Sequence, residues 1–245
     1  MLKRLSSQSL RYLQRQCSLQ SRLCSQTSSI EESTQTSINP LEHDDYFDVK
    51  RLTKKIDLFN NRVHLGHKVG TRNPYMLPYI FGNRLGVDIL DLDQTHELMK
   101  EALNFIAHVA YRDGIILFIS RHLHTIPLVE KAAEECGEYS HCRQWMTGTL
   151  TNSSVKFGAV TRLPDLCIFL STQDTVFEQH AAVIEAAKMY IPSVAVVDSA
   201  CDPRLITYPI PGNDDTPCAV ELYLKLFKEA ILKGKQQRML DANQK

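Results

Sequence analysis

The fold of this chain is decided by residues 191–198, which read Ile-Pro-Ser-Val-Ala-Val-Val-Asp. The run from Val194 to Val197 is continuously apolar and is followed by an acid, which is typical of a short strand buried on both faces. Two other runs, Ile115 to Ile119 and Leu166 to Leu170, have the same pattern. Strands of this kind belong to parallel sheets whose connections are covered by helices.

Amphipathic segments separate these strands. Their apolar residues recur at helical spacing, so the chain is predicted to have an α/β fold of three layers, α/β/α, with a mostly parallel, doubly wound sheet. We also expect residues 61–86 to form an irregular, structured loop and Val87 to Leu92 a short strand. The expected helices cover 41–60, Asp93 to about Arg112, 126–135, Asp174 through Ala187, and Thr216-Pro217 to about Lys233, where Gly234 ends the last one.

Composition excludes several classes of protein. The chain has 245 residues, of which 43% are hydrophobic and 23% charged, as in an ordinary globular domain. No apolar run approaches the roughly 20 residues that a membrane-spanning helix needs. The seven cysteines form no Cys-x-x-Cys pair, and only five lie beyond the first 30 residues. A reducing compartment is therefore expected, without a disulfide framework.

The first 30 residues differ from the rest in charge. They hold five basic residues and no acidic one, although the whole chain has 28 of each sign. A segment that is rich in Arg and Ser, poor in acids and interspersed with Leu is typical of a mitochondrial transit peptide. We predict a transit peptide over 1–30, an N-terminal extension with a short helix over 31–60, the core over 61–233 and a polar C-terminal tail over 234–245.

The ends of the predicted strands lack the motifs of an enzyme. Ligands of open parallel sheets bind outside these ends, which read Ser120-Arg121-His122, Ser171-Thr172-Gln173-Asp174 and Asp198-Ser199-Ala200-Cys201-Asp202. They contain no glycine-rich phosphate loop and no Gly-x-Ser-x-Gly elbow. No catalytic residue and no cofactor is predicted. The alternative hypothesis is a mitochondrial α/β nucleotide-binding protein or enzyme that uses these strand ends.

Several groups of residue types that bind metals have simpler explanations. No group supplies four ligands at a recognisable spacing. The acid pair before Thr216 suits a helix N-terminus, and the pair before Pro203 suits a turn. No metal site is predicted, although the group that contains Cys136 stays open. The groups are His64 with His67, His122 with His124, Cys136 with His141 and Cys142, Asp198 with Asp202, and Asp214 with Asp215.

Residues 50–84 are strongly basic. Eight basic side chains accompany one acid, Asp57, and aromatic residues such as Tyr75 lie among them. Residues 165–221 instead carry nine acids and two basic residues. Basic side chains contact phosphates and exposed rings stack on bases, so the basic segment is compatible with RNA binding, although a charged run by itself is more often a solvated surface. Its eight basic residues are Lys50, Arg51, Lys54, Lys55, Arg62, Lys68, Arg72 and Arg84.

Four longer strings resemble, in the same order, the signatures of one family, the universal small-subunit ribosomal protein number two. They span about residues 60–232. With the predicted transit peptide, the chain is similar to the mitochondrial form of this family. The strings are Val63-His64-Leu65-Gly66-His67 with Asn73-Pro74-Tyr75-Met76 and Pro78-Tyr79-Ile80-Phe81-Gly82, Trp145 to Asn152, Ile191 to Asp198 with Asp202-Pro203, and Tyr208 to Asp215.

The resemblance implies a flavodoxin-like core without catalytic activity, on the solvent side of the small ribosomal subunit, in contact with rRNA and neighbouring ribosomal proteins. It assigns ten signature residues to the folding of loops and the ribosome-facing surface: Gly66, Pro74, Met76, Gly148, Asp198, Pro211, Gly212, Asn213, Asp214 and Asp215. Together with the basic segment, it gives as candidate RNA or ribosome contacts Lys50, Arg51, Lys54, Lys55, Arg62, His64, His67, Lys68, Arg72, Asn73, Tyr75, Arg84, Trp145, Thr151 and Asn152.

The chain departs from the family pattern at three places. Bacterial members carry a long helical hairpin after the string that ends in Asn152, but here Asp165 follows after only 13 residues. Arg72 stands where the family usually has Trp, and Thr147 where it commonly has Gly. We expect altered local contacts with RNA or protein at these positions.

Three hypotheses of different classes follow. The leading one is a non-enzymatic structural component of the mitochondrial small ribosomal subunit, located in the matrix and required for mitochondrial translation. The enzyme hypothesis predicts saturable binding of a nucleotide or flavin. A third, a free RNA-binding regulator, predicts a protein that stays off the ribosome in a density gradient.

Overall fold

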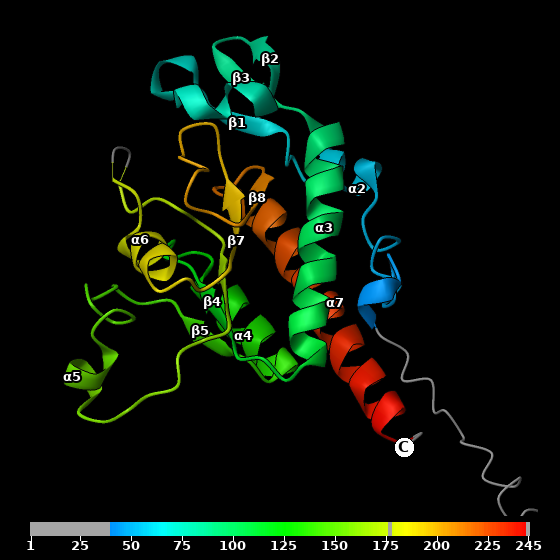
Figure 1. Cartoon of the computed structure of the whole chain (residues 1–245). Helices are drawn as coiled ribbons and strands as arrows, with labels where there is room; N and C mark the ends of the chain where they lie inside the picture. The colour runs from blue at the N-terminus through cyan, green and yellow to red at the C-terminus, as the bar shows by residue number, and fades with distance from the viewer. Residues whose placement is uncertain (1–39, 176–177, 244–245) are drawn as a thin grey trace, which may run out of the picture. The chain divides into compact units, whose positions relative to one another are not determined.

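The central element of the structure is a five-stranded parallel sheet with the order β5-β4-β6-β7-β8 (Figure 1). The computed structural model describes residues 40–175 and 178–243, so the predicted transit peptide lies outside the described residues. In chain order the strands run 2-1-3-4-5, the flavodoxin-like arrangement. The predicted α/β fold is confirmed. The strands are β4 (Ile116–Ile119), β5 (Tyr139–His141), β6 (Leu166–Phe169), β7 (Ser193–Val197) and β8 (Tyr208–Pro211).

Helices cover both faces of this sheet and produce the three layers. Alternate residues of the three central strands belong to different cores. Phe118 and Ile168 pack with helices α3, α4 and α7, whereas Ile119 and Phe169 pack with α6 and Trp145. The three apolar runs are continuous because both faces of the sheet are buried. The helices are α3 (Leu92–Tyr111), α4 (Ile126–Cys136), α6 (Ala181–Lys188) and α7 (Pro217–Asn243), with a short α5 (Ser153–Phe157).

A second, three-stranded antiparallel sheet occupies the region predicted as an irregular loop over 61–86. Its order is β1-β3-β2, with β1 (Leu65–Lys68), β2 (Ile80–Arg84) and β3 (Val87–Leu90). The strand expected near Val87 is present, but it pairs here and not in the parallel sheet. These strands are only partly buried, so no continuous apolar run marks them in the sequence. Short 3-10 helices, η2 (Val69–Thr71) and η3 (Pro74–Tyr79), connect β1 to β2.

The single helix predicted over 41–60 is wrong. The segment contains a 3-10 turn, η1 (Pro40–Glu42), several turns and only a six-residue helix, α2 (Lys55–Asn60). The Asp45 carboxylate accepts hydrogen bonds from the N–H groups of Val49 and Lys50, which offers the backbone an alternative to helical bonding. Phe47 and Val49 are nevertheless buried in the core.

Two predicted helix starts are shifted. Asp91, not Asp93, caps α3, because its side chain accepts from the N–H of Asp93. Helix α6 begins at Ala181 with the His180 side chain as its cap. Asp174, the predicted cap of that helix, instead forms an ion pair with Arg121 at 2.6 Å.

The last helix does not end at Gly234 as predicted, because α7 continues to Asn243, so residues 234–243 are helical and not a tail. Gly234 is buried where α7 crosses α3, and a Cβ placed there would lie 2.5 Å from the carbonyl oxygen of Ala107. The glycine therefore permits close helix packing.

Asp241 near the helix end accepts hydrogen bonds from Tyr46 and Tyr111. None of the described helices combines the length and apolar character needed to cross a membrane.

Replacing Gly234 with Ala tests this explanation. Ala normally stabilises a helix interior by about 1 kcal/mol relative to Gly. Here we expect a loss of about 1–3 kcal/mol in the free energy of unfolding, because the methyl group would meet the backbone of Ala107. Urea unfolding would measure it, with exposed Gln236→Ala on the same helix as the control. A Gly234→Ala variant more stable than the unchanged chain would contradict the packing role.

Candidate functional site

The carboxyl edge of the parallel sheet is closed by β1 of the small sheet. The N–H of His67 donates to Ser199 Oγ at 2.8 Å, and His67 Nδ1 lies 2.7 Å from the Asp198 carboxylate. Gly66 sits so close to this edge that a Cβ there would lie 2.9 Å from Ser199 Oγ. The first and third sequence signatures therefore meet where β7 ends.

Two asparagines complete this junction. The N–H of Asn73 donates to the carbonyl oxygen of Ser199 at 2.9 Å. Asn213 donates from its backbone to Val63 and from its side chain to the carbonyl of Arg62. Asn213 Oδ1 also accepts from the backbone N–H groups of Asp215 and Thr216, so Asn213 stabilises the turn that leads into α7. The fourth signature thus holds the first one in place.

The junction is strongly acidic. Asp198 and Asp214 are buried, while Asp215 is exposed. The hydrogen bond to Asp198 raises the pKa of His67 to about 9. Burial raises the pKa of Asp214, and the charges of Asp198 and Asp215 raise it further. Closely spaced carboxylates disfavour a phosphate ligand at this edge.

The topological switch point between β4 and β6, where flavodoxin-like domains bind ligands, is also occupied. Arg121, which follows β4, forms its ion pair with Asp174, which follows β6. Ser120 and Thr125 are buried and hydrogen-bond to each other at 3.0 Å. This arrangement argues against the nucleotide-binding alternative.

Two groups of described residues could hold a cation. His67, Asp198 and Asp215 place ligand atoms within 4.8 Å of one another, as do His122, Asp214 and Asp215. Among the described residues, Cys136, His141 and Cys142 form no such group. Both thiols are buried, and burial raises the pKa of each to about 11, which keeps them protonated.

The second signature is held by a buried carboxylate that sequence reasoning missed. Glu185 of α6 is 4% exposed and accepts from the N–H groups of Gly148 and Leu150, the latter at 2.9 Å. Burial raises the pKa of Glu185, but these N–H groups outweigh it, so its pKa lies below the ordinary value. The available signal was one acid between apolar residues in Ala181–Lys188.

The structure divides the eight basic residues of the basic segment into two sets. Four make ion pairs with nearby acids, and Arg72 binds the fully buried Asp88 through two nitrogens, one at 2.8 Å. That pair explains how Arg replaces the usual Trp at this position. The paired residues are Lys50 with Asp44, Arg51 with Asp48, Lys55 with Asp93, and Arg72 with Asp88. Across the part of the chain that the structure describes, Lys54, Arg62, Lys68 and Arg84 form no ion pair.

The other candidate contact residues are distributed over several environments. Trp145 is buried against His141 and His180, so it belongs to the core. Tyr75 is half exposed beneath the guanidinium of Arg204, 3.8 Å from the ring centre. Thr151 and Asn152 are exposed beside α5. Of the signature residues, Met76, Pro211 and Gly212 are buried, whereas Pro74 is exposed.

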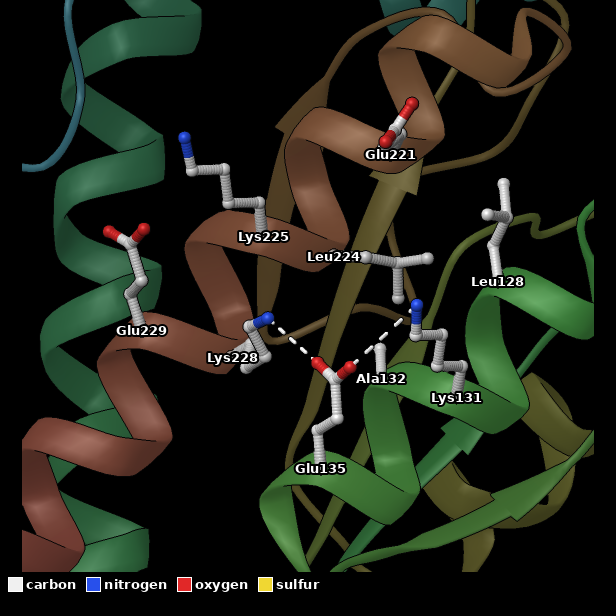
Figure 2. Close-up of a pocket in the computed structure, with 9 residues that line it drawn as sticks. All are labelled: Leu128, Lys131, Ala132, Glu135, Glu221, Leu224, Lys225, Lys228 and Glu229. Atoms are coloured by element: carbon white, nitrogen blue, oxygen red, sulfur yellow. Dashed lines mark hydrogen bonds and ion pairs between the residues drawn. The ribbon is translucent and has the colours of Figure 1, made fainter.

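A groove of about 290 Å³ lies between α4 and α7 (Figure 2). Leu128, Ala132 and Leu224 line it together with charged residues of both signs. Glu135 pairs with Lys228 at 2.8 Å and with Lys131 at 4.0 Å. Charges that neutralise one another within the groove give no pattern for a particular ligand.

The fold and junction define a flavodoxin-like α/β domain whose ligand edge is closed by a basic segment. A profile of the family described as Ribosomal protein S2 matches residues 58–163 and 154–234. The two matches overlap over residues 154–163, which include most of α5.

Individual relatives agree with this match. The chain is 56% identical over 199 residues to the small ribosomal subunit protein uS2m of Bos taurus, covering 81% of this chain and 68% of the bovine protein. It is 34% identical over 227 residues to the small ribosomal subunit protein uS2 of Rickettsia bellii, covering 75% and 77% of the two chains. The chain belongs to the ribosomal protein S2 (uS2) family, and it resembles the mitochondrial form of that family.

The His67–Asp198 contact predicts a pH-dependent stability. The pKa of His67 is raised from 6.5 to about 9 in the folded chain. The contribution of the contact to the free energy of unfolding is therefore complete below pH 6.5 and is lost as the pH rises through about 9. We expect the difference in this free energy between the unchanged chain and His67→Asn to shrink as the pH rises from 6.5 to about 9. Urea unfolding with EDTA present would measure it, and a difference independent of pH would refute the contact.

Replacing Glu185 with Gln should loosen the second signature. The amide has one acceptor oxygen, so one of the N–H groups of Gly148 and Leu150 loses its partner. We expect a loss of about 1–3 kcal/mol in the free energy of unfolding. Exposed Glu221→Gln serves as the control, and equal stability of the two variants would contradict the role of Glu185.

Proposed function

We propose that this chain is a structural constituent of the mitochondrial small ribosomal subunit. It resides in the matrix, contacts small-subunit rRNA and neighbouring ribosomal proteins, supports mitochondrial translation and catalyses no reaction. The 56% identity to the bovine protein, which is named a small ribosomal subunit protein, carries this proposal. The acidic edge covered by β1 supports the absence of catalysis, because its carboxylates disfavour the phosphates of a nucleotide.

The small sheet supports an RNA contact. Lys68 of β1 and Arg84 of β2 are both paired with Val87 of β3. Directly opposed residues of antiparallel strands project to the same face, so both cations flank Val87 on one face. With strands about 4.8 Å apart, their backbones are separated by roughly twice that distance. Two exposed, unpaired cations at this spacing suit the phosphates of an RNA backbone.

The opposite face of the small sheet has a different role. Asp88 follows Val87, so it projects to that opposite face, where it binds Arg72. The face with Lys68 and Arg84 is thereby kept free of this acid. We assign Lys68 and Arg84, with Lys54 and Arg62, to rRNA contact, and Arg72 to the structure of the sheet itself.

Removing the two cations of the small sheet should weaken RNA binding. For Lys68→Ala with Arg84→Ala, we expect the slope of log K against log salt for small-subunit rRNA to fall by about two, one for each phosphate contact. Filter binding of the full chain would measure the slope. In cells, the variant should be depleted from the small-subunit peak of a sucrose gradient.

The matched control is Lys50→Ala with Arg51→Ala, which removes the same charge from residues that are already paired with acids. It should change the slope much less. An equal effect of the two double variants would show that only net charge matters. Full sedimentation of Lys68→Ala with Arg84→Ala in the small-subunit peak would count against the assigned contact.

A further inference from the structure

An exposed aromatic stack lies at the start of the basic segment. The rings of Phe59 and His64 are 4.7 Å apart between centres and only 10° from parallel. His64 covers one face of the Phe59 ring, yet the Phe59 side chain is 59% exposed. The other face of the ring is therefore open to solvent and available to a planar group.

The inner ring of this stack is uncharged, and its backbone is anchored. The carbonyl oxygen of His64 accepts a hydrogen bond of 2.8 Å from the N–H of Leu90 in the small sheet. Burial lowers the pKa of His64, so the imidazole is neutral at physiological pH. A neutral ring on an anchored backbone beneath Phe59 reduces the rearrangement needed before a planar ligand adds to the stack.

Positive charge adjoins the platform. Arg62 follows α2, and its N–H donates to the carbonyl of Phe59 at 3.0 Å. The Arg62 side chain belongs to the unpaired set of cations. Asp57 and Lys54 lie two and five residues before Phe59, which on a helix are turns of about 200° and about 500°, so both project away from Phe59.

We propose that the Phe59–His64 stack binds an unpaired nucleobase of RNA, with Arg62 contacting a neighbouring phosphate. The inference rests on the proposed function and adds the chemical group that is recognised. Base stacking on an aromatic ring accepts any base, and a cation beside the ring follows the backbone. An apolar protein surface would gain nothing from this cation, so the charge favours RNA.

The test compares two oligomers of ten nucleotides, single-stranded oligoadenylate and an abasic RNA of the same length, binding to the full chain by fluorescence anisotropy. We expect the unchanged chain to prefer oligoadenylate. Phe59→Leu keeps the apolar volume but removes the ring, and it should weaken oligoadenylate binding at least about five-fold. Binding of the abasic oligomer should not change, and Phe59→Trp should retain the preference.

The control is Phe157→Leu, because Phe157 is 58% exposed but lies outside the basic segment. It should leave both affinities unchanged. The stacking site is refuted if the unchanged chain binds both oligomers equally or binds neither, or if Phe59→Leu keeps the preference. The stacking site is also refuted if Phe59→Leu leaves the binding of both oligomers unchanged but lowers co-sedimentation of the chain with the small subunit. Phe59 would then contact a protein. The proposed function is judged separately, by co-sedimentation of the unchanged chain.

Discussion

The contact between His67 and Asp198 joins the two sheets of this protein, and the rest of the arrangement depends on it. A parallel sheet presents its carboxyl edge as a ligand site, with N–H groups and loops directed outward. Here β1 covers that edge, and the backbone bonds of Asn73 and Asn213 fasten it on either side. The carboxyl edge, where such sheets bind ligands, is here the place where β1 of the small sheet attaches.

This attachment determines where the charge of the molecule lies. The acids at the edge are buried or engaged, and Lys68 follows the fastened His67 directly. Four of the eight cations in the basic segment are neutralised by acids, which leaves Lys54, Arg62, Lys68 and Arg84 for a partner. The small sheet carries two of these cations, Lys68 and Arg84, and the other two flank α2. That is sufficient for a limited RNA contact on a chain whose net charge is zero.

Much of the fold could be predicted from the sequence, because the central strands are buried on both faces and leave continuous apolar runs at 116–119, 166–169 and 194–197. The small sheet could not, since its strands are half exposed and depend on contacts with Asp198 and Ser199 far along the chain. Gly234 was misjudged because a glycine that ends a helix and one that admits a neighbouring helix look alike in sequence.

The candidate contacts were predicted by charge, which identifies the segment but not the pairing within it. Arg72 forms an ion pair with Asp88 because of the register of β3, and no local sequence pattern reveals that register. The RNA contact can be located directly by cross-linking the chain to rRNA with ultraviolet light in purified mitochondrial small subunits and mapping the cross-linked peptides by mass spectrometry. We expect cross-links within residues 54–68 and around Arg84. Cross-links confined to the acidic residues 165–221 would contradict this expectation.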